Sequence, residues 1–175
     1  GKKANTPAKG DLFVIDEESE DLDVDKLERF HHIVSKLLFV SKRARLDIEL
    51  AISFLCTRVS KSTVQDWEKL RRLLSYIQGT IDMPRIIGAN GFEVLQTYVD
   101  ASYATHNDMR GHTGGLMTLG HGIVHDKCSK QKLNTKSSTE TEVVGASDYI
   151  GHTLFMKWFL KAQGYEINKN ICLLY

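Results

Sequence analysis

Two acidic residues occupy positions from which carboxylates commonly serve metal-dependent chemistry. Asp100 lies at the end of the strand-like run Tyr98-Val-Asp-Ala-Ser-Tyr103, and Glu142 lies near the start of a long helical pattern. Ligands and metals in α/β sheets are usually held at strand ends. Mg²⁺ takes carboxylate oxygens, and phosphoryl chemistry often uses two such ions close together. The pair therefore marks one candidate catalytic and metal site.

Each acid also has a structural interpretation. In the structural interpretation, Asp100 simply ends a strand at a turn. Glu142 follows Thr139 by three residues, which is the spacing of a capping box at a helix start. Glu140 follows Ser137 by the same interval. Because such caps are common, both interpretations stay open on the pattern alone.

A zinc site is suggested by His121, His125 and Cys128, but the local pattern argues against it. Gly120 and Gly122 favour a hairpin, and four residues of extended chain span about 13 Å. One zinc ion has its ligands only about 2 Å away. A nucleophile pair of Cys128 and His125 also lacks a helix N-terminus that would activate the thiol. We therefore expect neither site.

Residues 1–25 should form a flexible, acidic lead-in. They are turn-rich and have a net charge of −5. A segment of like charge buries little apolar area. The exception is the short apolar patch of Phe13, Val14 and Ile15, which is suited to dock or to form a brief strand.

Residues 26–83 are predicted to form a small helical bundle. Ser62 and Gln65 have capping-box spacing and mark the start of the third helix. The apolar residues recur at three-and-four spacing in three runs, which are 27–41, 48–59 and 67–77.

The overall net charge of +1 hides a strongly basic helical segment. Residues 26–75 carry a net charge of +6, whereas residues 76–175 are neutral. Their outward faces include Arg71 and Arg72, which makes a surface able to contact phosphates. Ordinary solvated charge is the alternative interpretation.

Residues 84–175 change to an α/β pattern. The predicted strand 92–101 is followed by a hairpin through Gly120-His-Gly122 and by a further strand from Ile171. The expected fold class is α/β, and α+β when the two parts are taken together. A long helix precedes that last strand and has apolar residues at helical spacing, namely Val143, Ala146, Ile150, Leu154 and Trp158.

Membrane insertion and a disulfide framework are not expected. No apolar run approaches the roughly 20 residues that a membrane helix needs. The chain has three widely spaced cysteines, which fits a reducing compartment and no disulfide partner.

Several blocks, in order, resemble copia-type retrotransposon Pol polyproteins. The α/β part is similar to their ribonuclease H domain, and the helical part is similar to the C-terminal end of their reverse transcriptase. Together the blocks cover about residues 27–175, although Leu46 replaces the proline of one motif. They are Phe30-His-His-Ile-Val-Ser-Lys-Leu-Leu-Phe39, Arg45-Leu-Asp-Ile48, Asp66-Trp-Glu-Lys-Leu70 to Tyr76-Ile-Gln-Gly-Thr80, Tyr98-Val-Asp-Ala-Ser-Tyr-Ala104, His112-Thr-Gly-Gly115, Ser129-Lys-Gln131 and Lys136-Ser-Ser-Thr-Glu-Thr-Glu142.

The resemblance implies a ribonuclease H-like fold, two Mg²⁺ ions, and hydrolysis of the RNA strand of an RNA–DNA hybrid. Asp100 matches the first metal-binding acid, and Glu142 matches the second, with Glu140 in reserve. The third acid of the family belongs to an Asp-Asn step after the strand that starts at Ile171, and the fourth lies further on. We therefore expect a domain truncated before its third acid, and a 175-residue chain that is inactive by itself.

The resemblance also implies partners. The expected partners are RNA–DNA hybrid and the remainder of the Pol polyprotein. The expected location is the cytoplasm, within a virus-like particle, or the nucleus. A non-catalytic nucleic-acid-binding module from a decayed or co-opted element is the alternative. A structural helical adapter would leave Asp100 unexplained. Backbone phosphates would be held near a helix N-terminus by Lys130, Lys132, Lys136, Ser137 and Ser138.

Overall fold

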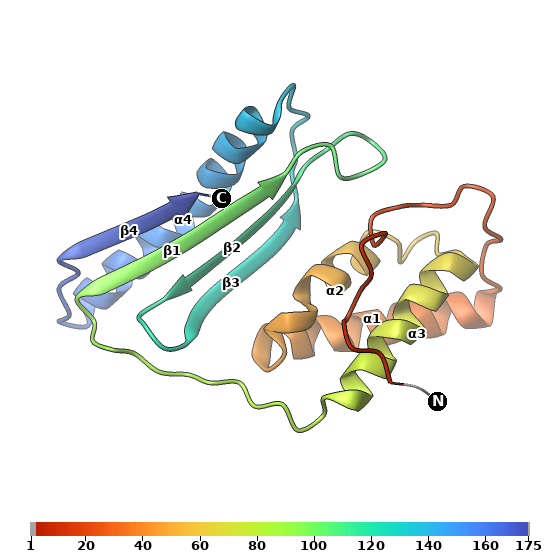
Figure 1. Ribbon diagram of the computed structural model, residues 1–175, viewed down its shortest axis with the longest axis horizontal. Helices are drawn as coiled ribbons and strands as arrows, with labels where there is room; N and C mark the ends of the chain where they lie inside the picture. The colour runs from red at the N-terminus through yellow and green to blue at the C-terminus, as the bar shows by residue number, and fades with distance from the viewer. Residues whose placement is uncertain (1–2, 175) are drawn as a thin grey trace. The chain divides into compact units, whose positions relative to one another are not determined.

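The computed structural model describes residues 3–174, and within them the chain forms two compact units with a boundary between Arg85 and Ile86 (Figure 1). The first unit is helical, and the second combines a mixed sheet with one long helix, which confirms the predicted mixed α/β fold class. Each unit has its own hydrophobic core. Among the described residues, no helix has the length and apolar character needed to cross a bilayer.

Three α-helices and one 3₁₀ helix build the first unit: α1 spans Val24–Arg43, η1 Leu46–Ile48, α2 Glu49–Cys56 and α3 Val64–Gly79. Apolar residues recur along these helices at helical spacing, so each presents an apolar stripe. Phe30 and Val34 of α1 are fully buried, as are Ile52 of α2 and Leu73 of α3. The core therefore lies where the stripes of the three helices meet.

An ion pair fixes the start of η1 against the end of α3. The Arg45 guanidinium bonds both carboxylate oxygens of Asp47, at 2.9 and 2.7 Å, and donates to the backbone carbonyl of Thr80 at 3.0 Å. Tyr76 of α3 donates its hydroxyl hydrogen to the same aspartate at 2.9 Å. Hydrogen bonding to Arg45 and Tyr76 holds the pKa of Asp47 below its ordinary value although burial opposes the shift. Arg45 and Asp47, from the sequence block Arg45-Leu-Asp-Ile48, therefore have a structural role.

The cap of α3 lies one residue later than the Ser62 and Gln65 spacing predicts. The N-cap is Thr63, and its backbone N–H donates to the Asp66 side chain at 3.0 Å. Ser62 is unavailable because its hydroxyl donates to the carbonyl of Arg58 at 2.8 Å. The preceding turn thus decides which residue caps the helix.

The acidic lead-in makes more contacts than its charge suggests. Leu12 is buried in the helical core, and the Phe13 ring meets the Phe54 ring edge-on at 5.4 Å. A bridge between Asp21 and Thr63 joins the end of the segment to the N-cap of α3. The flexible connector expected from the charge pattern is therefore packed against the helices through its few apolar side chains, while most of its acids stay exposed.

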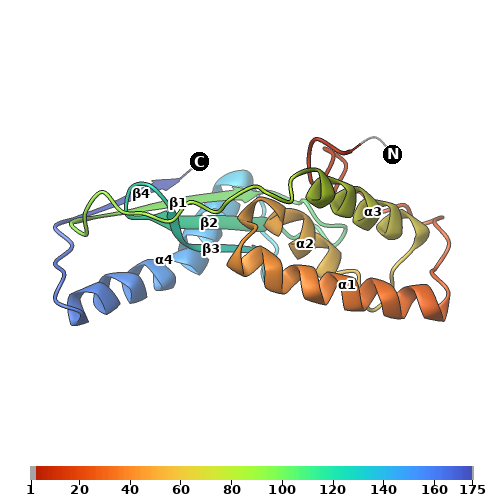
Figure 2. The ribbon, with the colours of Figure 1, turned by 90° about the horizontal axis from the view of Figure 1, so that it is seen from below.

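The second unit is a four-stranded sheet with the order β3-β2-β1-β4. Strand β2 is antiparallel to β1 and β3, whereas β4 is parallel to β1. The helix α4 connects β3 to β4 and lies along one face of the sheet, which Figure 2 shows from its edge. The bounds are β1 Val94–Ser102, β2 His112–Thr118, β3 Ile123–Lys130, α4 Ser138–Ala162 and β4 Lys169–Leu174.

The hairpin predicted at Gly120 is present between β2 and β3, and this glycine has a φ of 125°, which side chains rarely allow. Both strands extend beyond the apolar runs that reveal them in the sequence. Strand β3 continues through polar residues to Lys130, which pairs with His112. Backbone pairing with β2, and not side-chain hydrophobicity, sets this length.

The sheet-facing side of α4 is built mainly from small and polar residues. Thr141, Gly145 and Thr153 are buried there with Tyr149, and the Thr153 hydroxyl lies 3.2 Å from that of Thr97 in β1. Small residues let a helix approach a sheet closely, which larger apolar ones would prevent. The predicted apolar stripe is on the other side, where Val143, Ile150, Leu154 and Trp158 are exposed.

Candidate metal and nucleic-acid site

Asp100 lies near the C-terminal end of β1, opposite Gly114 of β2, and its side chain is exposed. The strand explains this exposure. Val99 is buried and Thr97 contacts α4, so alternate residues of β1 face the helix. Asp100 belongs to the other set. The backbone therefore presents this carboxylate to solvent at the strand end.

Glu142 is half-buried near the N-terminus of α4, at the end of the helix that lies beside the C-terminal end of β1 (Figure 1). The N-cap of this helix is Ser137, whose hydroxyl oxygen accepts from the Glu140 backbone N–H at 3.2 Å. The Glu140 carboxylate in turn accepts from the backbone N–H of Lys136 at 2.7 Å. Glu140 thus takes the capping role, and the alternative cap of Glu142 on Thr139 does not form.

Gln131 links the surroundings of the two acids. It is 1% exposed, and its side-chain amide donates to the Thr113 hydroxyl and to the Thr141 carbonyl, both at 2.9 Å. Thr113 is the cross-strand partner of the residue after Asp100, and Thr141 directly precedes Glu142. One buried amide therefore joins β2 to the start of α4 and fixes the position of the helix beside β1.

The predicted phosphate-binding residues do not share one environment. Lys130 forms an ion pair with Asp108 at 2.7 Å, and this bond holds the pKa of Asp108 below its ordinary value. Lys132 and Lys136 have exposed side chains close to the start of α4. Ser137 is occupied as the N-cap, and exposed Ser138 is the first residue of the helix. A helix N-terminus favours anions, so the two exposed lysines fit that function best.

Arg71 and Arg72 lie in α3, in the first unit, and have different partners. Arg71 donates to both carboxylate oxygens of Glu68, at 2.8 and 3.0 Å. Arg72 donates to the Thr6 hydroxyl at 2.8 Å. The two neighbouring arginines therefore differ in their surroundings. In these contacts only the charge of Arg71 is balanced by an adjacent carboxylate.

Comparison with known proteins finds similarity to retrotransposon Pol polyproteins. It is 33% identical over 114 residues to the uncharacterized mitochondrial protein AtMg00810 of Arabidopsis thaliana, which covers 65% of this chain and 47% of that protein. It is 27% identical over 132 residues to the retrovirus-related Pol polyprotein from transposon TNT 1-94 of Nicotiana tabacum, which covers 75% of this chain and 10% of that polyprotein. A Ty1-NL2 Gag-Pol polyprotein of Saccharomyces cerevisiae matches 86% of this chain at 25% identity, over 9% of its own length. These homologues support the predicted resemblance to a fragment of a copia-type retrotransposon Pol polyprotein.

The chain spans about half, or much less, of the length of the curated relatives it matches. No protein-family model matches it. No solved structure matches it either. The relationship to other Pol polyproteins therefore rests on sequence identity along most of the chain.

A row of interacting side chains that includes two buried histidines is not evident from the sequence pattern. His106 lies 2.9 Å from His112 between ring nitrogens, and His112 lies 3.0 Å from the Cys128 sulfur. Burial, and next the neighbouring histidine, lower the pKa of His112 to about 4. Only the register of the hairpin, which sets β2 against β3, could have revealed this cluster.

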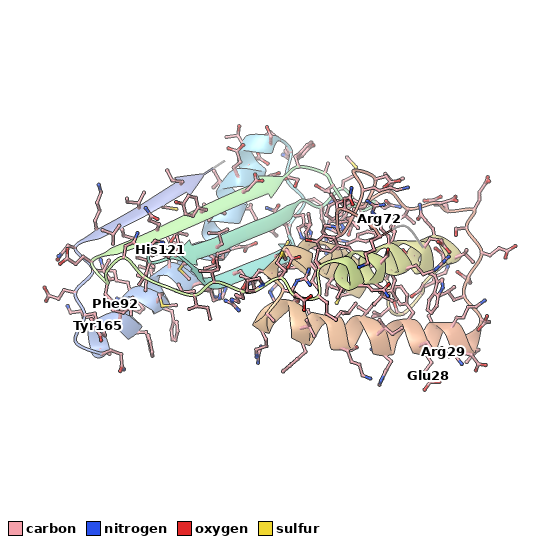
Figure 3. The ribbon with its side chains drawn as sticks, turned by 60° about the horizontal axis from the view of Figure 1, so that its bottom comes forward. Glu28, Arg29, Arg72, Phe92, His121 and Tyr165 are labelled. Carbon is pink, nitrogen blue, oxygen red and sulfur yellow. The ribbon has the colours of Figure 1, made fainter. Side chains whose placement is uncertain are left out.

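The two histidines of the suggested zinc cluster, His121 and His125, have other surroundings than Cys128. His121 is exposed at the hairpin (Figure 3), and His125 contacts the Tyr149 hydroxyl of α4 at 2.9 Å. Within residues 3–174, no group of three or more His, Cys, Asp or Glu side chains is arranged to hold a metal ion.

Mg²⁺ commonly takes one or two carboxylates and completes its shell with water and substrate phosphates. Asp100 and Glu142 fit that requirement in chemical type.

Proposed function

We propose that this Pol segment joins the end of a reverse transcriptase to the first half of a ribonuclease H domain. In the polyprotein it would contribute to Mg²⁺-dependent hydrolysis of the RNA strand of RNA–DNA hybrids. One observation carries the proposal: the strand bearing Asp100 is central in a mixed sheet, and the helix bearing Glu142 begins beside the end of that strand. Its similarity to Pol polyproteins supports the same assignment.

Asp100 and Glu142 would hold the metal in this proposal. Bound Mg²⁺ supplies positive charge that activates water and stabilises the leaving oxygen. The exposure of Asp100 leaves its carboxylate accessible to a substrate phosphate. Gln131 acts as a positioning residue, because its two hydrogen bonds hold the backbone next to Glu142. Lys132, Lys136 and the N-terminus of α4 would contact backbone phosphates of the hybrid.

The decisive experiment is a cleavage assay on the polyprotein that contains this segment, with labelled RNA in an RNA–DNA hybrid and with Mg²⁺ or EDTA. Asp100→Asn and Glu142→Gln should each abolish cleavage, because both remove a negative charge with little change of shape. Glu140→Gln is the matched control. A glutamine still serves a capping box, so only the dipole interaction of about 0.3–1 kcal/mol is lost.

Two outcomes contradict the proposal in different ways. If Glu140→Gln removes activity and Glu142→Gln does not, the second ligand is wrongly assigned by two residues. If hybrid is bound but never cleaved in Mg²⁺, the non-catalytic binding module is the better explanation. The codons that follow Tyr175 offer an independent check, because an Asp-Asn step there favours the enzyme.

A further inference from the structure

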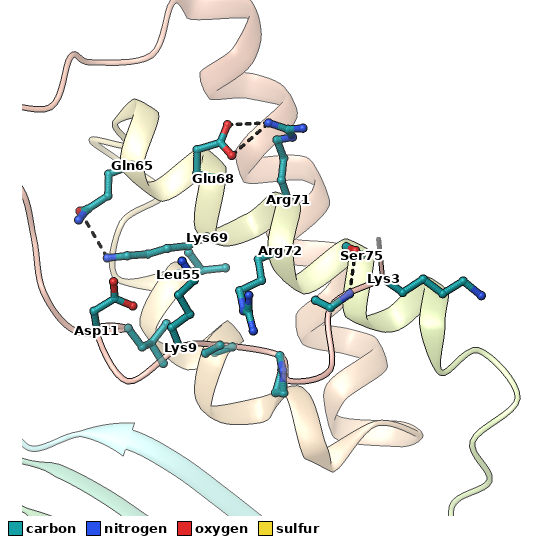
Figure 4. Close-up of a pocket in the computed structure, with 15 residues that line it drawn as sticks. Lys3, Lys9, Asp11, Leu55, Gln65, Glu68, Lys69, Arg71, Arg72 and Ser75 are labelled. Carbon is teal, nitrogen blue, oxygen red and sulfur yellow. Dashed lines mark hydrogen bonds and ion pairs between the residues drawn. The ribbon is translucent and has the colours of Figure 1, made fainter. Parts of the chain in front are cut away.

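A cavity of about 550 Å³ lies in the first unit, between α3 and the lead-in (Figure 4). Three contacts hold the lead-in over it. The Ala4 backbone N–H donates to the Ser75 hydroxyl at 3.2 Å, and Thr6 accepts from Arg72. Lys69 donates to the carbonyl of Val14 at 2.6 Å. Folding of the lead-in thus creates a cavity whose volume falls in the usual range for small-molecule sites.

The cavity is lined by both charged and apolar side chains. Its lining includes five basic and two acidic side chains. Of the five basic residues, Arg71 forms an ion pair with Glu68, and Figure 4 shows this pair at the upper end of the lining residues. The apolar residues of the lining are Ala4, Pro7, Ala8, Leu12, Ala51 and Leu55. A ligand that matches this mixed lining carries an anionic group on a small organic body.

Arg72 has donor capacity that the protein does not use. Its Nε is buried and has no hydrogen-bond partner among residues 3–174, although the same guanidinium bonds Thr6. A buried, unpaired donor of a charged group is costly. Guanidinium groups match the geometry of phosphate oxygens and bind them through paired N–H donors. Because Arg72 lines the cavity, an oxygen bound there would be a suitable acceptor for this donor.

Lys69 adds a second cation at the cavity. Its ammonium lies 4.6 Å from the centre of the Phe54 ring. Burial, the largest cause, lowers the pKa of this amine, whereas the charges of Asp66 and Asp11 oppose the shift. A bound anion would favour the charged form further. The charge and burial of Lys69 therefore point to the same class of ligand as Arg72.

We infer that this cavity binds a phosphomonoester group attached to a nucleoside, either in a free nucleotide or at the end of a nucleic-acid strand. Arg72 and Lys69 hold the phosphate, and the apolar residues of the lining contact the attached sugar or base. Every lining residue belongs to the first unit. The inference therefore goes beyond the proposed hydrolysis and does not depend on Asp100 or Glu142.

The test uses the full 175-residue chain and amide NMR spectra. Adenosine 5′-monophosphate should shift signals of α3 and the lead-in, whereas adenosine should not. Arg72→Gln should weaken binding of the nucleotide about tenfold, the size expected for losing a charge-assisted contact. Lys36→Gln is the matched control, since it removes the same charge from an exposed position of α1. It should leave the affinity unchanged.

Two further probes distinguish the sources of the phosphate. Stronger binding of a 5′-phosphorylated oligodeoxynucleotide than of its 5′-hydroxyl form indicates a strand end, whereas a preference for the mononucleotide indicates a free ligand. The inference is overturned if nucleotide and nucleoside give the same shifts, or if Lys36→Gln weakens binding as much as Arg72→Gln. Should Arg72→Gln fail to fold, Lys69→Gln and the comparison of nucleotide with nucleoside still decide the question.

Discussion

A Cβ atom added to Gly145 of α4 would lie 2.9 Å from the Cβ of Ala101 in β1. Cβ atoms in proteins essentially never approach so closely, so the helix lies as near to the strand as the two backbones permit. Asp100 directly precedes Ala101, and Glu142 lies three residues before Gly145. This contact therefore sets the separation between the backbones that carry the two candidate metal ligands.

Gly145→Ala should destabilise the second unit by about 1 kcal/mol. Overpacking costs about 1–3 kcal/mol, and the better helix propensity of alanine returns about 1 kcal/mol of that loss. Urea unfolding measures the difference. Gly151→Ala is the matched control in the same helix, because nothing lies within 4 Å of the added atom there. It should stabilise by up to about 1 kcal/mol, and equal stabilisation by both substitutions would contradict close contact with β1.

Gln131→Leu should destabilise the second unit by about 2 kcal/mol. The leucine leaves the Thr113 hydroxyl and the Thr141 carbonyl without the amide that bonds them, and unsatisfied buried polar groups cost about 1–3 kcal/mol each. Amide exchange should accelerate first at the start of α4. Lys132→Leu is the control, because Lys132 is the exposed residue next to Gln131. It should change neither the free energy of unfolding nor the amide exchange of α4. If the amide protons of α4 exchange as slowly in Gln131→Leu as in the wild type, Gln131 does not position the helix.

Acidification should destabilise the second unit through His112. Its pKa falls from 6.5 to about 4 on folding, so between these values the unfolded chain binds a proton that the folded chain does not. The free energy of unfolding should therefore be fully retained above pH 6.5 and fall by up to about 3 kcal/mol as the pH drops to about 4. Burial also lowers the pKa of His106, which acts in the same direction.

The measurement is urea unfolding across this pH range, followed by NMR signals of β2. His112→Asn should flatten the pH dependence, whereas His121→Asn at the exposed hairpin should preserve it. A wild-type stability that does not change between pH 6.5 and pH 4 would show that His112 is not buried in its neutral form.

Binding of RNA–DNA hybrid should depend on salt through Lys132 and Lys136. Replacing both with glutamine should reduce the slope of log affinity against log salt by about 2, or roughly one unit for each lost phosphate contact. Lys130→Gln should have a smaller effect, because Lys130 is already paired with Asp108. Fluorescence anisotropy at several salt concentrations measures these slopes. An unchanged slope in the double variant would assign both lysines to ordinary solvation.

The order of the elements was predictable from local patterns. Apolar spacing revealed α1, α2 and α3, and two glycines revealed the hairpin between β2 and β3. The capping role of Glu140 was also available as a spacing. Each of these features depends on residues close together in the chain, where the periods of helix and strand act directly.

The remaining features depend on contacts between distant residues. The stripe through Val143 and Trp158 suggests the packed side of α4, but close approach to β1 requires the side that carries Gly145. The bonds of Gln131 and the cluster around His112 arise only once strands and helix are assembled. Leu12 lies beside the short apolar run Phe13-Val-Ile15 of an otherwise acidic segment, and its burial depends on contacts with the distant helices.

The parallel pairing of β4 with β1 has a consequence during synthesis. β4 begins 75 residues after β1, with α4 between them. A ribosome that adds 5–20 residues per second needs roughly 4–15 seconds to make that stretch. Once β2 has been made, β1 can pair with it on one side, while until β4 is made the other edge of β1 offers unpaired N–H and C=O groups to any strand nearby. The pace of translation between residues 94 and 169 thus controls how long the nascent strand carrying Asp100 is open to incorrect pairing.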